Sequence, residues 1–257
     1  AALLAKEALI KIENIDLVFI TTKKENIKVL KTIGIESIYY KLNIFSQIST
    51  LIFRLIKDSR VHNIIERLGG VSPFERFLRK KSIDLVYFLS LSKKALELSS
   101  INYFITIWDI SHLDEPEFPE IRDFSIANIR DSINISVLKK ASRIFVDSNY
   151  SIKNISNRYS LDKNKLKVLS YEPSIAIKQF NKEDYSNSID CSQAQKTKKN
   201  YIFYPAQFWP HKNHSYILLA LKLIKDKYNV TVSAKFSGGE KGNKNYITNL
   251  AKRLGLK

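Results

Sequence analysis

The stretch SRIFVDSNYSIKNISNRYSLDKNKLKVLS, from Ser142 to Ser170, contains in short form the pattern that decides the fold. It begins with a run rich in β-branched and aromatic residues (142–148) and continues with a helical pattern (149–159). A second short apolar run follows (166–170). A strand, a helix and another strand in this order predict a β-α-β unit with parallel strands.

The same alternation extends along the chain in both directions. Further strands are expected at 15–22, 36–40, 83–90, 102–108, 201–208 and 230–236. Helical patterns are found at 2–13, 24–33, 46–68, 73–81, 121–141, 210–227 and 243–254. The sequence therefore predicts an α/β protein whose mostly parallel sheets are covered on both faces.

The alternation stops in a polar stretch without clear period, residues 172–199. We interpret this stretch as a linker or an extended loop. It separates an N-terminal domain, residues 1–171, from the start of a C-terminal domain, residues 200–257. Two strands are too few for a stable doubly wound sheet, so we expect the second domain to be truncated.

Composition narrows the classes of partner. The formal net charge of +17 favours an anionic partner, such as nucleic acid, an acidic lipid surface or a phosphorylated small molecule. The single cysteine, Cys191, excludes an internal disulfide. No apolar run reaches the roughly 18 residues of a membrane-spanning helix.

The loop WDISHLDEPEFP follows the strand expected at 102–108. Ligands of open α/β sheets bind beyond the carboxyl ends of the strands. Asp109 and His112 lie three residues apart there, so the carboxylate can orient the imidazole, or both can act on one substrate hydroxyl. Alternatively, Asp109 caps the next turn and His112 is a surface residue. Glu120 is expected in the first turn of the following helix, where negative charge is favoured. The acids of DEPE lack a second ligand cluster, so we expect no metal site.

A second loop, YPAQFWPHKNHS, covers residues 204–215. Pro210 is expected to open a helix whose first turn holds residues 211–214. Free N–H groups at that turn, together with Lys212, would bind a phosphate or diphosphate. The alternative is a lysine on an ordinary surface helix. In SGGEKGN, Gly238 and Gly239 would let the backbone approach a ligand closely.

Four segments occur in a characteristic order: FITIWDISHLDEPEFPEI (104–121), ASRIFVDSNYSIKNISNRYSLDKNKLKVLSYEPS (141–174), YIFYPAQFWPHKNH (201–214) and FSGGEKGN (236–243). Together they resemble the bacterial group 1 (family 4) glycosyltransferases of the GT-B fold. Within this family they look like mannosyltransferase-type enzymes of surface polysaccharide assembly, such as lipopolysaccharide. The resemblance covers nearly the whole chain. It implies two Rossmann-like domains with parallel sheets, an acceptor-side N-terminal domain and a C-terminal domain that binds a nucleotide-sugar.

The resemblance also implies a chemistry. Such enzymes move a sugar, with retained anomeric configuration and usually without a metal, from a GDP- or UDP-sugar to a hydroxyl of a glycan or lipid-linked acceptor. Lys212 matches the family's lysine that neutralises the donor diphosphate. Gly238 and Gly239 match the glycine loop near the donor, and Gln207 stands near where many relatives have an arginine. We expect Asp109 and His112 to meet the transferred sugar or the acceptor hydroxyl.

The helix expected from Ser46 to Gly69 has apolar residues at helical spacing and arginines and a lysine among its polar positions. It is either a surface that rests on an anionic membrane or an ordinary helix with its apolar face on the sheet. The first interpretation places the protein in the cytoplasm, peripheral to the inner face of the membrane. Two other functions remain open: a polyanion-binding module and a GT-B epimerase of nucleotide-sugars. The chain has no recognisable nucleic-acid motif, and we expect no nucleic-acid partner.

Overall fold

The computed structural model describes residues 15–55, 70–118, 120, 124–170 and 201–256. The helix expected at 2–13, the second part of the helix expected at 46–68 and the linker expected at 172–199 lie outside these residues. The chain divides into two compact units, Ala1–Ile110 with Asn128–Gln179, and Ser111–Ala127 with Phe180–Lys257. The segment 111–127, which the sequence places with the N-terminal domain, is therefore grouped with the C-terminal unit.

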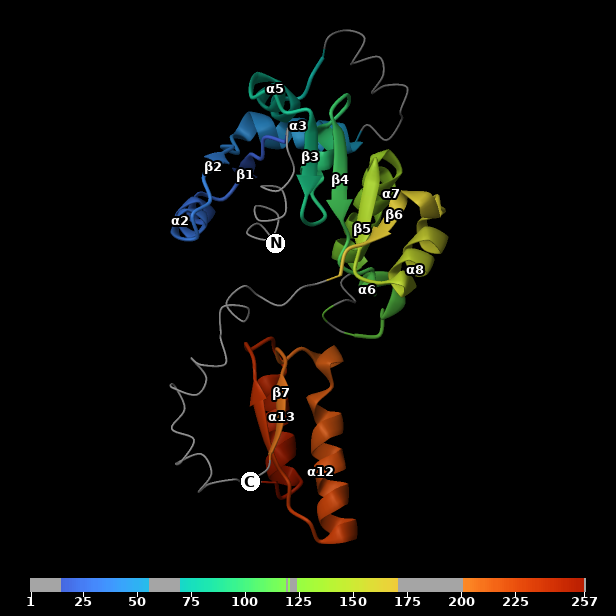
Figure 1. The fold of residues 1–257 in the computed structure, drawn as a ribbon. Coiled ribbons are helices and arrows are strands. Elements are labelled where there is room, and N and C mark those ends of the chain that lie inside the picture. Colours follow the sequence, from blue (N-terminus) through green and yellow to red (C-terminus); the bar gives the residue numbers. More distant parts are fainter. Residues whose placement is uncertain (1–14, 56–69, 119, 121–123, 171–200, 257) are drawn as a thin grey trace. The chain divides into compact units, whose positions relative to one another are not determined.

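The first unit contains two parallel sheets in its described part (Figure 1). In the larger sheet the strand order follows the sequence: β3 (Leu85–Phe88), β4 (Asn102–Thr106), β5 (Arg143–Val146) and β6 (Leu166–Val168). The smaller sheet pairs β1 (Phe19–Thr21) with β2 (Ser37–Tyr39). Parallel pairing requires a crossover between successive strands, and the alternating helices supply most of these connections.

The helices of the first unit are α2 (Lys24–Thr32), α3 (Ile44–Leu55), α5 (Pro73–Lys80) and α8 (Asn149–Tyr159), with short turns η1 (Lys93–Glu97) and η2 (Lys163–Lys165). The helix α7 (Phe124–Lys140) belongs to this unit from Asn128 onward. Local chemistry sets several of their ends. The Ser72 hydroxyl accepts the backbone N–H of Glu75 and Pro73 occupies the first helical position of α5. Ser148 caps α8 in the same way, and α8 ends at Ser160 in the left-handed conformation.

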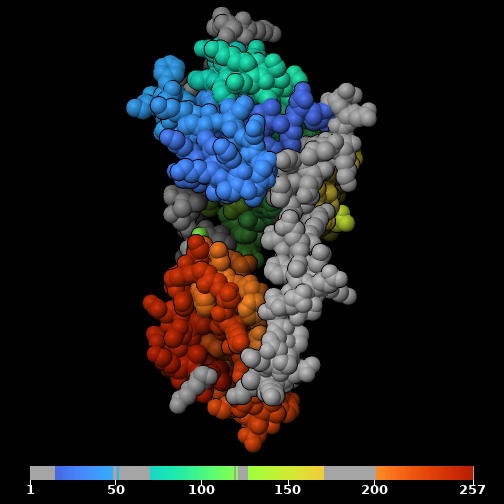
Figure 2. All heavy atoms as spheres, turned by 60° about the vertical axis from the view of Figure 1, so that its left-hand side comes forward, coloured from blue at the N-terminus to red at the C-terminus, as the bar shows by residue number. Residues whose placement is uncertain are grey.

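The core of this unit lies between the four-stranded sheet and its helices. Side chains from both kinds of element are fully buried there, including Leu78, Ile105, Leu138, Ile144 and Ile155. Residues 15–55 gather on one face of the first unit, shown in blue in Figure 2. They comprise the smaller sheet with α2 and α3.

A buried carboxylate holds α5 to the turn before β4. Glu75 is fully buried and accepts hydrogen bonds from the backbone N–H and hydroxyl groups of Ser99 and Ser100, and from Arg79 at 3.0 Å. Burial raises the pKa of Glu75, but the bonds from Ser100, Ser99 and Arg79 outweigh it and lower the pKa to about 2. The charged form of Glu75 is therefore part of the folded structure.

The second unit contains α6 (Ser111–Asp114), β7 (Tyr201–Pro205), η3 (Pro210–Lys212), α12 (His214–Tyr228), β8 (Ser233–Ser237) and α13 (Lys244–Arg253). Strands β7 and β8 pair in parallel, from Tyr201 with Ser233 to Pro205 with Ser237. Phe208, Leu218 and Ile247 form the buried core, and Phe236 and Leu250 are among the residues that pack against it. Among the described helices of the whole chain, none is long and apolar enough to cross a bilayer.

Candidate functional site

The loops that follow β7 and β8 touch each other. A Cβ atom on Gly238 would lie 2.1 Å from the Ala206 carbonyl oxygen and 2.8 Å from the Cα atom of Gln207. The backbone N–H of Phe208 donates to the Gly239 carbonyl at 3.0 Å. Only glycine fits at position 238, because any side chain would collide with the neighbouring backbone. The structure thus brings Gln207, Gly238 and Gly239 together, at the carboxyl ends of the two strands.

The helix expected from residue 210 begins later in the structure. Pro210–Lys212 form the short 3-10 turn η3, and Asn213 follows with φ of 49° in the left-handed region. This conformation interrupts the helical path, and α12 starts at His214 with the Asn213 side chain as its cap. The backbone N–H groups of Lys212 and Asn213 already donate to the carbonyls of Trp209 and Pro210. The expected set of free N–H groups is therefore smaller than the sequence suggested.

Lys212 remains available at this turn. Its side chain is exposed, and its carbonyl accepts the Tyr204 hydroxyl at 2.7 Å, which fixes the turn to β7. Lys241, in the β8 loop, and Lys244, the first residue of α13, reach the β7 loop: their Nζ atoms lie 5.5 Å from the ring of Trp209 and 5.9 Å from the ring of Phe208, respectively. We call Lys212, Lys241 and Lys244 the lysine cluster.

Two polar side chains modify the surroundings of the lysine cluster. Gln207 accepts the indole N–H of Trp209 at 3.0 Å, so its oxygen is engaged while its amide N–H₂ is left to donate. Glu240, the acid of the β8 loop, accepts the backbone N–H groups of Gly242 and Lys244. Glu240 therefore caps the start of α13, and the two loops retain a positive balance suited to an anion.

The buried His214 packs against residues of β7 and of the loop that follows it. His214 is fully buried; its ring stacks on Phe208 at 4.5 Å and contacts Tyr204 and Phe236 edge-on at 5.0 and 5.2 Å. Within the described residues, neither ring nitrogen forms a hydrogen bond of regular geometry. Burial lowers the pKa of His214, and a backbone contact with Ala206 opposes this only in part. His214 is consequently a neutral, structural member of the core.

The turn η3 is also held by a contact with Glu120 that the sequence did not predict. Glu120 accepts both the backbone N–H of His211, at 3.2 Å, and the His211 ring, whose Nδ1 atom lies 2.5 Å from Oε1. Glu120 lies in a turn, and the described part of α7 begins at Phe124. The two residues are 91 positions apart, and no local pattern links them.

Asp109 and His112 are assigned to different units, although they lie only three positions apart in the chain. Asp109 belongs to the first unit, where Arg130 of α7 donates to its carbonyl and to its carboxylate, both at 2.8 Å. His112 belongs to the second unit, in α6, and is buried. Arg130 is a further residue that sequence reasoning missed, although a cation opposite a loop carboxylate is a common arrangement.

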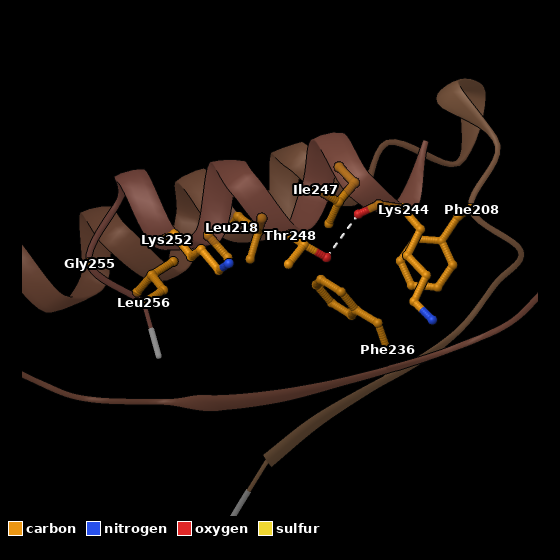
Figure 3. A pocket seen from close by; sticks show the side chains of 10 residues that line it. Phe208, Leu218, Phe236, Lys244, Ile247, Thr248, Lys252, Gly255 and Leu256 are labelled. Carbon is orange, nitrogen blue, oxygen red and sulfur yellow. Dashed lines mark hydrogen bonds between the residues drawn. The ribbon is translucent and has the colours of Figure 1, made fainter. Parts of the chain in front are cut away.

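The second unit also has a mainly apolar pocket of about 640 Å³ (Figure 3). Phe208, Phe236, Ile247 and Leu256 are among its apolar lining residues, and its polar positions are Lys244, Thr248 and Lys252. Thr248 donates its hydroxyl to the carbonyl of Lys244 and is thereby satisfied within α13. The lining includes Lys244 of the lysine cluster but not Lys212, Gln207, Gly238 or Gly239, so this pocket is an open side of the hydrophobic core and does not contain the residues that the sequence predicts for the anion.

Comparison with known proteins identifies similar structures. No protein-family model and no curated protein matches the chain. A glycosyltransferase from Rickettsia africae ESF-5 is similar with a TM-score of 0.53 at 14% identity, over 93% of this chain and 57% of that chain. HepE from Anabaena, solved in complex with UDP and glucose, is similar with a TM-score of 0.55 at 18% identity, over 90% of this chain and 56% of that chain.

The chain spans little more than half the length of either neighbour. At these identities the similarity concerns the fold. The expected α/β architecture with parallel sheets is confirmed. The chain has the fold of these glycosyltransferases, consistent with Rossmann-like domains of the GT-B type.

Proposed function

We propose that the protein transfers a sugar from a nucleotide-sugar to a hydroxyl group of an acceptor. The observation that carries this proposal is the lysine cluster at the carboxyl ends of β7 and β8. Loops at this edge of a parallel sheet are where α/β proteins bind nucleotides. The fold is shared with HepE, whose structure holds UDP and glucose.

In this proposal, residues 200–257 belong to the donor-binding domain and residues 1–171 to the acceptor side. Lys212 neutralises the charge that develops on the leaving nucleoside diphosphate, which is the largest electrostatic demand of the reaction. The amide N–H₂ of Gln207 donates to the same phosphates. The open space at the Cβ position of Gly239 lets the β8 loop approach them, and Gly238 lets the same loop pack against Ala206. Following the resemblance, we propose that the reaction needs no metal.

Asp109 and His112 are assigned to the sugar and the acceptor hydroxyl. Arg130 holds the backbone and the carboxylate of Asp109 with two hydrogen bonds, which fix the loop after β4. His112 is buried, and an imidazole is the side chain that most often serves as a proton acceptor.

The finer assignment follows the sequence resemblance. We infer a retaining hexosyltransferase of the group 1 (family 4) type, mannosyltransferase-like, with a GDP- or UDP-sugar as donor. The acceptor is a glycan or a lipid-linked glycan of surface polysaccharide assembly, such as lipopolysaccharide. The reaction takes place in the cytoplasm, where nucleotide-sugars are the common activated donors.

Proton NMR of the product sugar tests this assignment. The product of the whole gene is incubated with GDP-mannose or UDP-glucose, and water serves as the acceptor. The anomer of the free sugar that forms first is recorded. We expect the sugar to be released slowly, with the anomeric configuration that it has in the donor. The rate of this release should fall about 100-fold in Lys212→Ala. His112→Ala should lower the rate and leave donor affinity unchanged. Inversion at the sugar C2 would instead identify an epimerase, and no turnover of any donor would contradict the proposal.

A further inference from the structure

The side chain of His211 is fixed on two sides within the second unit. Its Nδ1 atom lies 2.5 Å from Oε1 of Glu120, and the same oxygen accepts the His211 backbone N–H at 3.2 Å. The ring of Phe118 meets the imidazole edge-on, with 5.9 Å between the ring centroids. Phe118 and Glu120 lie two positions apart, so one short segment of the chain sets the orientation of this histidine.

Glu120 also determines which nitrogen of the ring faces outward. Burial raises the pKa of Glu120, but the hydrogen bonds from His211 outweigh it and lower the pKa, so the carboxylate is charged. An ionised carboxylate only accepts hydrogen bonds, and Nδ1 of His211 is therefore the donor. The two nitrogens of an imidazole point in nearly opposite directions, so Nε2 points away from Glu120. The His211 side chain is 25% exposed, and Nε2 forms no hydrogen bond within the described part of the chain.

His211 is the main partner of the Glu120 charge. The Glu120 side chain is only 10% exposed, and its second oxygen, Oε2, is buried without a hydrogen-bond partner among the described residues. A buried carboxylate is costly unless a cation lies against it. A protonated imidazole supplies that cation and keeps a second N–H for another acceptor.

This histidine directly precedes Lys212 in η3. Lys212 is exposed, and the hydrogen bond from the Tyr204 hydroxyl to its carbonyl holds the turn at the end of β7. An anion that binds Lys212 comes close to the negative charge of Glu120, which repels it. The imidazole of His211 contacts this carboxylate directly, so it is the group that can offset the repulsion.

We propose that His211 is a second ligand of the diphosphate at Lys212, whose Nε2–H donates to a phosphate oxygen while Nδ1–H stays on Glu120. The ring is then an imidazolium between two anions, and Glu120 is the residue that orients it. The proposal rests on the proposed function, because it names a further binding group for the same nucleoside diphosphate.

Two substitutions separate the outward nitrogen from the contact with Glu120. His211→Asn places an amide N–H₂ near the position of Nδ1 and can keep the hydrogen bond to Glu120, but nothing in it replaces Nε2. His211→Gln places its amide near the position of Nε2 and can still donate to a phosphate. UDP and GDP are titrated calorimetrically into the product of the whole gene. We expect the affinity for the nucleotide that binds to fall at least about tenfold in His211→Asn and clearly less in His211→Gln.

A double variant distinguishes a phosphate ligand from a residue that only holds the turn. His211→Ala leaves the Glu120 carboxylate uncompensated, so the addition of Glu120→Gln should restore part of the lost affinity. If His211 only holds the turn, His211→Asn binds like the unchanged protein and the second substitution restores nothing. Either of these results would overturn the proposal. Similar melting temperatures establish that each variant remains folded.

The same titrations keep the two proposals apart. Nucleotide binding that Lys212→Ala weakens, but that His211→Asn leaves unchanged, would remove His211 from the site and leave the proposed function intact. Absence of UDP and GDP binding by the unchanged gene product would contradict the proposed function, and the role of His211 with it.

Discussion

The Nδ1 atom of His211 lies 2.5 Å from Oε1 of Glu120, and the same carboxylate oxygen accepts the backbone N–H of His211. Partial burial raises the pKa of Glu120, but the hydrogen bonds from His211 outweigh it and lower the pKa. A charged carboxylate therefore holds the residue directly before Lys212. The relationship makes Glu120 a positioning residue for the turn that carries the proposed phosphate ligand.

Glu120→Gln should loosen this turn. The variant keeps the shape of the side chain but loses its charge, and charge-assisted hydrogen bonds contribute roughly 1.5 to 3 kcal/mol. We expect nucleotide affinity to fall about fivefold or more, with a smaller effect on the melting temperature. Glu117→Gln, an exposed acid of the same segment, is the control and should bind nucleotide normally. Equal affinities of the two variants would remove the positioning role.

Gly238→Ala should disrupt the junction of the β7 and β8 loops. The added Cβ would lie 2.1 Å from the Ala206 carbonyl oxygen, so the backbone must move. Overpacking of this kind costs typically about 1 to 3 kcal/mol, and more where backbone blocks backbone. The adjacent Gly239 has open space at its Cβ position, and Gly239→Ala should be nearly neutral. Urea unfolding of both variants measures the difference, and similar midpoints would contradict the close approach of the loops.

Acid should weaken the first unit through Glu75. Its pKa is about 2 in the folded protein and near 4.5 in the unfolded chain, a difference worth about 3 kcal/mol. This stabilisation is complete above pH 4.5 and is lost as the pH falls toward 2. Glu75→Gln should lower the free energy of unfolding at pH 7 and flatten its dependence between pH 4.5 and 2. An unchanged slope in the variant would show that other carboxylates dominate acid unfolding.

Much of the fold could be predicted because its signals are local. Each of the eight strands in the described residues overlaps an expected one, and α8 was expected at its observed limits. The strands are shorter than expected, as with β1, because apolar runs continue into the loops. Sequence periodicity also located α3, but it could not say which face points outward, since that depends on what packs against the helix.

The candidate site was only partly predictable. Lys212, Gln207, Gly238 and Gly239 lie on two loops that successive parallel strands bring together, so local signals sufficed. The contacts of Glu120 with His211 and of Arg130 with Asp109 join residues far apart in the chain. The later start of α12 results from the left-handed backbone conformation of Asn213. Asparagine adopts this conformation at some positions and not at others, so the sequence alone did not predict it.

Mild acid should weaken the second unit through His214. Burial lowers its folded pKa below the usual value near 6.5, so the unfolded chain binds the proton more readily. Stability from this source is complete above pH 6.5 and declines as the pH falls toward the folded pKa. His214→Phe keeps an aromatic ring against Phe208 and cannot be protonated. We expect its melting temperature to change less between pH 7.5 and 5 than that of the unchanged chain, and parallel changes would refute the assignment.

Calorimetric titration of UDP, GDP and ADP tests the central claim most directly. Each nucleotide is titrated into the chain, into the product of the whole gene, and into both with Lys212→Ala or the control Lys227→Ala at the far end of α12. The account predicts saturable binding of one nucleoside diphosphate by the gene product, weakened at least about tenfold by Lys212→Ala and unchanged by Lys227→Ala. Absence of binding by the gene product, or equal affinity in both variants, would contradict the assignment of this loop to a nucleotide-sugar.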